Sequence, residues 1–234
     1  MHEEKKMKRE CINLDEEEWY QKIPENTTTE EQMFGPAIPP DDCTYLINIL
    51  LSSGCTKQNI LDVGCGYGRL TPTLSTIFEA VCSVDFKNDP RDKMGNNCVF
   101  INGDLRQKRC WLGITSMYAK YSVILLSYTL STTLTKNIST LIQNCTKVLT
   151  HNGYIIIHEF IAKDETRGEI WNDFAFALRT QDEYKNMAQE NELTIINTYR
   201  RIHQPYDVLT MICRKSNIPS PTQEPAFGKW FVEK

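Results

Sequence analysis

The stretch NILDVGCGYGRL, residues 59–70, carries the clearest structural signal in the chain. A short apolar run, residues 59–63, leads directly into three glycines at alternate positions, Gly64, Gly66 and Gly68. A helical pattern begins near Arg69. A strand, a glycine-rich turn and a helix in immediate succession are typical of a cofactor cradle, because glycine lets the backbone approach a ligand and the start of a helix presents N–H groups to an anion.

The spacing of the glycines distinguishes between cofactor classes. Loops that bind dinucleotides follow the pattern G-x-G-x-x-G, in which the third glycine allows the helix to pack closely against the strand. Here the pattern is G-x-G-x-G, and Arg69 stands where that third glycine would be. A nicotinamide dinucleotide is therefore disfavoured, while a purely structural glycine turn stays open as an alternative.

The rest of the chain alternates between strand-like and helix-like segments. Continuous apolar strands separated by helices favour a parallel sheet, and two late strand-like runs, 193–199 and 206–213, predict an antiparallel hairpin. We expect an α/β fold, Rossmann-like, with a seven-stranded mostly parallel sheet, a C-terminal antiparallel hairpin and helices on both faces. The other strand candidates are 59–63, 80–85, 98–102, 121–127 and 154–159, and the helix candidates are 41–53, 68–77, 136–149 and 179–191.

Three parts are expected along the chain. Residues 1–40 form a charged, partly disordered arm able to cap the active site, residues 41–214 form the cofactor-binding domain, and residues 215–234 form a tail. The charged start lacks the apolar core of a secretory signal, and no apolar run approaches the roughly 20 residues that span a bilayer. We therefore predict a cytoplasmic protein, with the nucleus as a second location, and no membrane partner.

Composition narrows the function further. The formal net charge is −4, and 41% of residues are hydrophobic, which fits a globular chain without a broad basic surface. The nine cysteines are scattered and form no C-x-x-C pair, so no metal site is expected and reduced thiols are predicted.

The pattern D-x-G-x-G-x-G at a strand end resembles motif I of the class I methyltransferases that use S-adenosylmethionine (SAM). The resemblance covers about residues 40–213 and implies SAM as cofactor. In that family the loop wraps the methionine half of SAM. The matching residues of this chain are Asp62, Gly64, Cys65, Gly66 and Gly68.

Further cofactor contacts follow from the same resemblance. Asp85 ends the second strand, with Phe86 beside it, and matches the carboxylate that accepts both ribose hydroxyls. Asp104 and Leu105 follow the third strand and match the adenine-binding pair, although an aspartate in a turn is also common for local reasons. Arg69 either pairs with the SAM carboxylate or lies exposed on the first turn of its helix.

The acceptor site would face the end of the fourth strand. Ser127 and Tyr128 are the candidates for lining it, and Ser127 also belongs to the predicted cofactor contacts. His158 and Glu159 end the fifth strand, 154–159, on the same rim and are candidates for catalysis, with idle rim residues as the alternative.

A narrower resemblance links the chain to the protein N-terminal (Xaa-Pro-Lys) methyltransferases. It rests on the lead segment from Trp19-Tyr20 and on Gly68-Arg69. That family has a tryptophan where this chain has Tyr128, and an Asp-Asn pair where this chain has Glu159-Phe160. The acceptor therefore does not carry over, and compensation by Asn172 and Asp173 is a hypothesis.

The leading prediction is a SAM-dependent methyltransferase that acts on a protein or a small molecule, with nitrogen as the favoured acceptor atom. The alternative is a non-catalytic, methyltransferase-like partner subunit of a complex. RNA stays open as an acceptor because of a short basic run, although a solvated loop explains that run equally well; its residues are Arg106, Lys108 and Arg109.

Overall fold

The computed structural model describes residues 38–39, 41–87, 89–163, 167–171, 174–203 and 205–216. Most of the predicted arm and tail lies outside these ranges, as do Asn172 and Asp173. The division of the chain into arm, domain and tail therefore stays a prediction.

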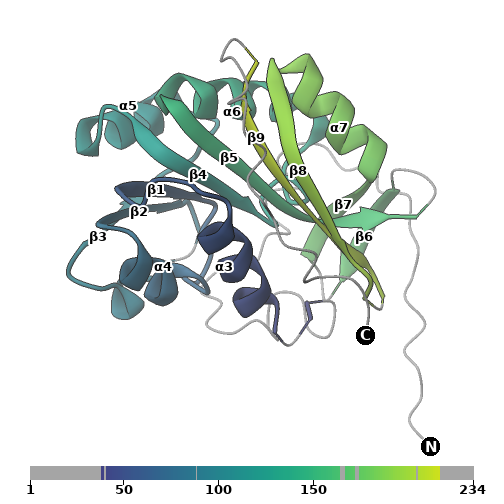
Figure 1. Cartoon of the computed structure of the whole chain (residues 1–234), viewed down its shortest axis with the longest axis horizontal. Helices are drawn as coiled ribbons and strands as arrows, with labels where there is room; N and C mark the ends of the chain where they lie inside the picture. Colours follow the sequence, from purple (N-terminus) through teal and green to yellow (C-terminus); the bar gives the residue numbers. More distant parts are fainter. Residues whose placement is uncertain are drawn as a thin grey trace, which may run out of the picture.

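A single twisted sheet forms the centre of the molecule (Figure 1). Its parallel part follows the order β3-β2-β1-β4-β5, and the hairpin of β8 and β9 adds to β5 in antiparallel fashion. The predicted class is confirmed, and the first four strands have the predicted bounds. The strands are β1 (Asn59–Val63), β2 (Ala80–Asp85), β3 (Cys98–Asn102), β4 (Tyr121–Ser127), β5 (Leu149–Ala162), β8 (Leu193–Arg201) and β9 (Asp207–Lys215).

The sheet has nine strands rather than the seven predicted, because a second hairpin follows β5. Its strands are β6 (Arg167–Trp171) and β7 (Phe174–Thr180). β7 runs parallel to β5 only at the very end of β5, where Ile161 and Ala162 pair with Arg179 and Thr180. The hairpin therefore extends the sheet at the edge where the parallel strands end.

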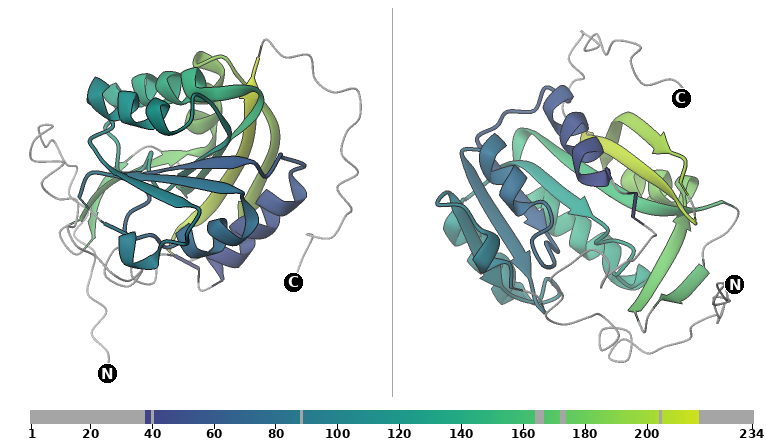
Figure 2. Two further views of the ribbon diagram at one scale, coloured as in Figure 1. Left: turned by 90° about the vertical axis from the view of Figure 1, so that its left-hand side faces the viewer. Right: turned by 90° about the horizontal axis from the view of Figure 1, so that it is seen from below.

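Helices cover both faces of the sheet, as Figure 2 shows. On one face lie α3 (Asp42–Ser52) and α4 (Thr71–Ile77), and on the other lie α5 (Lys108–Met117), α6 (Thr135–Val148) and α7 (Gln181–Glu190). Helix α5 fills the connection 103–120, whose sequence pattern is irregular. Connection 86–97 holds a 3-10 turn, η2 (Arg91–Lys93). No helix in the described part of the chain is long and apolar enough to cross a membrane.

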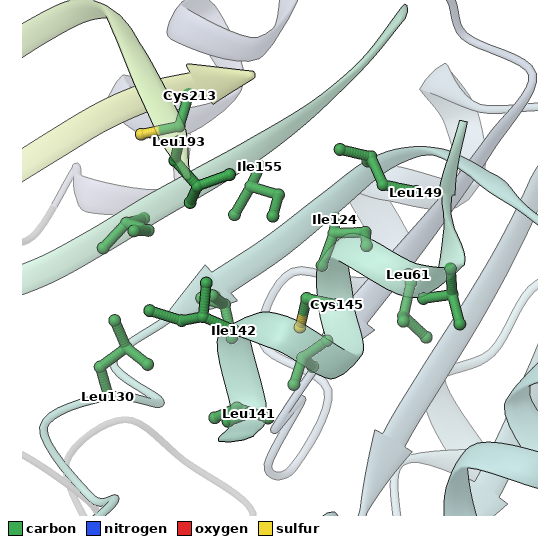
Figure 3. Packing of buried hydrophobic residues seen from close by; sticks show 14 of the residues in the cluster. Leu61, Ile124, Leu130, Leu141, Ile142, Cys145, Leu149, Ile155, Leu193 and Cys213 are labelled. Atoms are coloured by element: carbon green, nitrogen blue, oxygen red, sulfur yellow. The ribbon is translucent and has the colours of Figure 1, made fainter. Parts of the chain in front are cut away.

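The core explains why the strand sequences are continuously apolar. Alternate residues of β1 and β4 point to opposite faces, so Leu61 and Ile124 pack with α6 while Ile60 and Leu125 pack with α3 and α4. Figure 3 shows the first of these clusters, in which Ile142 and Cys145 of α6 meet the strands. Each such side chain, when fully buried, stabilises the fold by about 1.5–3 kcal/mol.

The strand order also fixes where a ligand would bind. The chain leaves β1 toward β2 on one side of the sheet and later returns to β4 on the other side of β1. In open α/β sheets, ligands bind at the carboxyl ends of the strands beside such a reversal. The carboxyl ends of β1, β2 and β4 meet at this point, and the predicted site residues lie there.

Candidate active site

Three glycines with left-handed backbone form the loop after β1. The φ angles are 69° at Gly64, 54° at Gly66 and 78° at Gly68, a region that other residues rarely adopt. A Cβ atom on Gly68 would lie 2.5 Å from Cβ of Pro90. One on Gly64 would lie 2.8 Å from Cγ2 of Thr129. At Gly64 and Gly68, both the backbone angle and the lack of space require glycine.

The loop is tied to the neighbouring strand β2. The N–H groups of Gly64 and Cys65 both donate to the carbonyl of Val84, at 2.8 and 3.1 Å. Asp85, the last residue of β2, accepts from the N–H of Gly66 at 3.1 Å and, with its other oxygen, from the N–H of Lys87 at 2.9 Å. The Asp85 carboxylate therefore has a fixed orientation at the mouth of the loop, beside Phe86.

Asp62, near the end of β1, is a buried carboxyl group with one oxygen that accepts no hydrogen bond from the described residues. Its residue is 2% exposed, and among the groups that the structure describes no donor reaches Oδ2. Burial raises the pKa of this carboxyl to about 7, against the opposing charge of Arg69. A buried polar atom without a partner is costly, so a donor supplied by a ligand would find a prepared acceptor here.

Arg69 is buried rather than exposed, with a side chain that is 10% accessible, so the exposed alternative is wrong. Its NH1 donates to Oδ2 of Asp42 at 2.8 Å and its NH2 donates to Oγ of Ser127 at 3.0 Å. The guanidinium also lies 5.3 Å from the centre of the Tyr128 ring. Arg69 thus joins the glycine loop to the end of β4.

His158 does not lie on a rim, because β5 continues to Ala162 and the residue is fully buried. Its Nε2 lies 3.1 Å from both oxygens of Asp42, and its Nδ1 lies 2.8 Å from Oγ1 of Thr210. Although burial disfavours a charged Asp42, His158 and Arg69 together hold the pKa of that carboxyl well below its usual range.

Glu159 is also fully buried within β5 rather than at its end. Its oxygens accept from the N–H groups of Leu130 at 2.6 Å and Ser131 at 3.1 Å. Arg179 of β7 donates to the carbonyls of the same turn, at 2.7 Å from Leu130 and 2.9 Å from Thr133. Glu159 and Arg179 therefore hold the turn after β4 from two sides.

Tyr128 begins that turn and has a strained backbone. Its φ of 57° is unusual for a residue with a side chain, and its N–H donates to the carbonyl of His158 at 2.8 Å. The ring is buried, with its centre 4.3 Å from that of Phe160 and 5.1 Å from that of His158. The end of β4 therefore presents a rigid aromatic wall.

Asp104 is engaged locally by its neighbour Arg106. The guanidinium pairs with both oxygens, Nε to Oδ1 at 2.9 Å and NH2 to Oδ2 at 2.7 Å, and the backbone N–H of Arg106 adds a contact of 2.9 Å. The carbonyl of Leu105 accepts from Nε1 of Trp111. The adenine role of Asp104 and Leu105 stays a prediction, and a ligand there would share the carboxylate with Arg106.

Comparisons with known proteins show which proteins share this architecture. Residues 61–157 match a family model described as a methyltransferase domain. A SAM-dependent methyltransferase from Leishmania major shares 16% identity over 85% of this chain and 80% of its own, with a TM-score of 0.68. Residues 61–157 therefore carry a methyltransferase domain, and the chain has the fold of SAM-dependent methyltransferases.

Two further structures with bound ligands have the same fold as this chain. The 1,6-didemethyltoxoflavin-N1-methyltransferase of Burkholderia thailandensis, which holds S-adenosylhomocysteine, is 17% identical over 75% of this chain and 77% of its own, with a TM-score of 0.61. The magnesium protoporphyrin IX methyltransferase of Synechocystis, which holds SAM, is 16% identical over 85% and 90%, with a TM-score of 0.56. No curated protein matches the sequence.

The methyltransferase fold brings together most of the predicted site residues, but the structure adds three that the sequence did not single out. These are Asp42, Thr210 and Arg179, which contact Arg69, His158 and the turn after β4. The sequence offers little signal for Asp42 in particular, because an aspartate in the first turn of a helix is common for electrostatic reasons alone.

Within the described residues, the eight cysteines are free thiols and no cluster suited to a metal ion occurs.

Proposed function

We propose that this chain is an active methyltransferase that moves the methyl group of SAM to a nitrogen atom of a protein or small-molecule acceptor. The observation that carries the proposal is the complete cradle at the carboxyl ends of β1 and β2. It combines a glycine loop that has no space for side chains at Gly64 and Gly68 with two carboxyl groups, Asp62 and Asp85, on either side of it.

The residues present fit the chemical groups of SAM. The unpartnered oxygen of Asp62 suits a ligand ammonium, which would also favour the charged form of this buried carboxyl. The guanidinium of Arg69 suits the carboxylate of the same amino-acid half. Each oxygen of Asp85 accepts a backbone N–H, and a carboxylate oxygen can accept more than one hydrogen bond, which suits the two ribose hydroxyls.

When bound, SAM supplies an activated methyl group on a positively charged sulfur. The protein's contribution is then to hold the acceptor in line with that group and to exclude water. Ser127 and Tyr128 at the end of β4 would form the wall on the acceptor side, as a rigid surface beside Arg69. We assign His158 and Glu159 to positioning, because both are fully buried and each has hydrogen-bond partners.

The choice of nitrogen draws support from the 1,6-didemethyltoxoflavin-N1-methyltransferase named above, whose name gives N1 as the methylated position. That likeness concerns the fold at 17% identity, so the acceptor itself needs a direct assay.

Calorimetric titration with SAM and with S-adenosylhomocysteine tests the cofactor site first. We expect wild type to bind with a Kd on the order of micromolar, and Asp85→Ala to weaken binding by about 100-fold, since it removes two charge-assisted acceptors. The matched control is Asp182→Ala, whose side chain is 84% exposed on α7. Binding by wild type and control but not by Asp85→Ala supports the proposal, and no binding by wild type overturns it.

The second half of the test follows labelled methyl groups from SAM into separate pools of peptides, metabolites and RNA. Transfer into one of the first two pools supports the proposal, and analysis of the product gives the acceptor atom. SAM binding without transfer to any pool would instead favour the non-catalytic partner subunit, and transfer into RNA alone would correct the acceptor class.

A further inference from the structure

We propose that Asp42, at the start of α3, is a positioning residue of the cofactor site that holds the guanidinium of Arg69 in place for the carboxylate of SAM. The inference rests on the proposed function. It extends the site to a helix that precedes β1 and lies outside the strand, loop and helix that form the cradle.

A continuous chain of contacts connects the glycine loop to α3, β5 and β9. Arg69 NH1 meets Oδ2 of Asp42 at 2.8 Å, and both Asp42 oxygens lie 3.1 Å from Nε2 of His158. His158 in turn meets Oγ1 of Thr210 on β9 at 2.8 Å. The side chains of Asp42 and His158 are fully buried. The orientation of Arg69 therefore depends on contacts that run through α3 and β5 to β9, the last strand of the sheet.

Asp42 does not serve the usual purpose of an acidic residue at a helix start. Such residues commonly cap backbone N–H groups or face water near the positive end of the helix. Here no side-chain cap forms at the α3 terminus, and the carboxylate is buried against Arg69 and His158 instead. Burying a carboxylate is costly unless it is well paired. The pairing with Arg69 and His158 offsets that cost and fixes the orientation of the Asp42 side chain.

A fixed guanidinium favours ligand binding. An arginine side chain loses rotamer entropy when it is held in one geometry. Asp42 fixes NH1 and Ser127 fixes NH2, so much of that ordering is already complete in the folded protein. The cofactor's carboxylate would then bind a preorganised partner.

The adjacent residue offers a matched control within the same helix start. Asp41 is 68% exposed in its side chain and pairs with Arg201 at the surface. Removing its carboxylate deletes the same charge one position earlier without touching Arg69. Asp41→Ala is therefore expected to bind both ligands described below as wild type does.

Two ligands separate a positioning role from general damage. S-adenosylhomocysteine carries the amino-acid half that Arg69 would bind, whereas 5′-methylthioadenosine has the adenosine and the sulfur but lacks that half. For Asp42→Ala we expect the Kd for S-adenosylhomocysteine to rise about 10-fold or more. The Kd for 5′-methylthioadenosine should change by less than about twofold, because the loss is confined to the contact with Arg69.

Asp42→Asn provides a conservative rescue if the alanine variant folds poorly. Its amide oxygen can accept from Arg69, and its NH₂ can donate to Nε2 of His158 once the ring proton lies on Nδ1, facing Thr210. We therefore expect Asp42→Asn to bind S-adenosylhomocysteine within about threefold of wild type. In an Arg69→Met background, Asp42→Ala should add no further loss.

The outcomes are distinct. A selective loss for S-adenosylhomocysteine in Asp42→Ala, rescued by Asp42→Asn, supports the proposal. An equal loss for both ligands, or tighter binding of S-adenosylhomocysteine by Asp42→Ala because Asp42 competes with the ligand carboxylate, overturns it. If wild type itself binds neither S-adenosylhomocysteine nor SAM, the proposed function has failed instead.

Discussion

The two halves of the candidate site differ in what their polar groups contact. On the cofactor side, at the ends of β1 and β2, Asp62 has an oxygen without a donor, and Gly64 and Gly68 let the backbone pass where a side chain would clash. On the acceptor side, at the end of β4 and within β5, His158 and Glu159 are fully buried and bonded to other parts of the chain.

This difference teaches where the protein is specialised for a ligand and where it is specialised for rigidity. A polar group that binds a ligand has unpaired hydrogen-bonding capacity before the ligand arrives, and this lowers stability. A group that only orients other residues can have all its hydrogen bonds within the protein. We therefore expect mutations on the cofactor side to affect ligand binding strongly. Mutations of His158 and Glu159 should act mainly through stability and through the position of the turn after β4.

The largest expected effect comes from Gly68→Ala on the cofactor side. The added Cβ would lie 2.5 Å from Pro90 Cβ at a φ of 78°, so the loop must move. We expect loss of detectable SAM binding by calorimetry and a fall in the free energy of unfolding of about 3–5 kcal/mol, since a left-handed alanine and an overpacked contact both destabilise.

Gly113→Ala is the matched control for that variant. This glycine lies in α5, and its added Cβ would meet only Cγ2 of Ile101, at 3.7 Å. Alanine there should leave SAM affinity unchanged and raise stability by about 0.5–1 kcal/mol, because glycine is unfavourable within a helix. Normal binding by Gly68→Ala would mean that the loop is not the cofactor cradle.

Glu159→Ala is expected to act on stability rather than on cofactor affinity. It leaves the N–H groups of Leu130 and Ser131 without their acceptor in a buried turn. We expect the free energy of unfolding to fall by about 2–4 kcal/mol in urea titrations. The Kd for SAM, measured on folded protein, should change by less than about threefold.

The control for this variant is Glu190→Ala, an exposed residue at the end of α7 that should change stability by less than about 0.5 kcal/mol. Glu159→Gln retains one acceptor oxygen and should give an intermediate loss of stability. A Glu159→Gln variant with wild-type stability and no methyl transfer would indicate instead a direct catalytic role for Glu159.

The contrast between the halves also explains how much the sequence predicted. The fold class, the first four strands and the cofactor loop all follow from local patterns. A buried parallel strand is continuously apolar, and a loop with left-handed angles at alternate positions favours glycine at those positions. Such requirements act on neighbouring residues, so they leave a signal that a single sequence reveals.

The features that the sequence did not predict depend on contacts between distant residues. Asp42 meets His158 across 116 positions, and Arg179 meets Leu130 across 49. Nothing near Asp42 distinguishes an aspartate that faces water from one that pairs with a buried arginine. The hairpin of β6 and β7 was also missed. The sequence of β6, RGEIW, has no continuous apolar run, and the apolar run of β7, residues 174–178, has no strand-like partner beside it in the sequence.

The smallest predicted effect concerns the pH dependence of stability at Asp62. Burial raises the pKa of this carboxyl to about 7, whereas an unfolded aspartate has a pKa near 3.8. Between these values the folded protein holds a proton that the unfolded chain has lost, so stability falls as pH rises through this window and is constant above it. Relative to Asp62→Asn, wild type should lose about 2 kcal/mol between pH 5 and pH 8.

Thermal unfolding of both proteins at these pH values measures that difference, and subtraction of the variant removes the other titrating groups that the two share. Saturating SAM should reduce the pH dependence of wild type, because a ligand ammonium beside Asp62 favours the charged carboxylate and lowers its pKa. If the difference between wild type and Asp62→Asn does not change with pH, Asp62 already has a partner in the folded protein. The cofactor side would then be as fully satisfied as the acceptor side, and the contrast between the two halves would not hold.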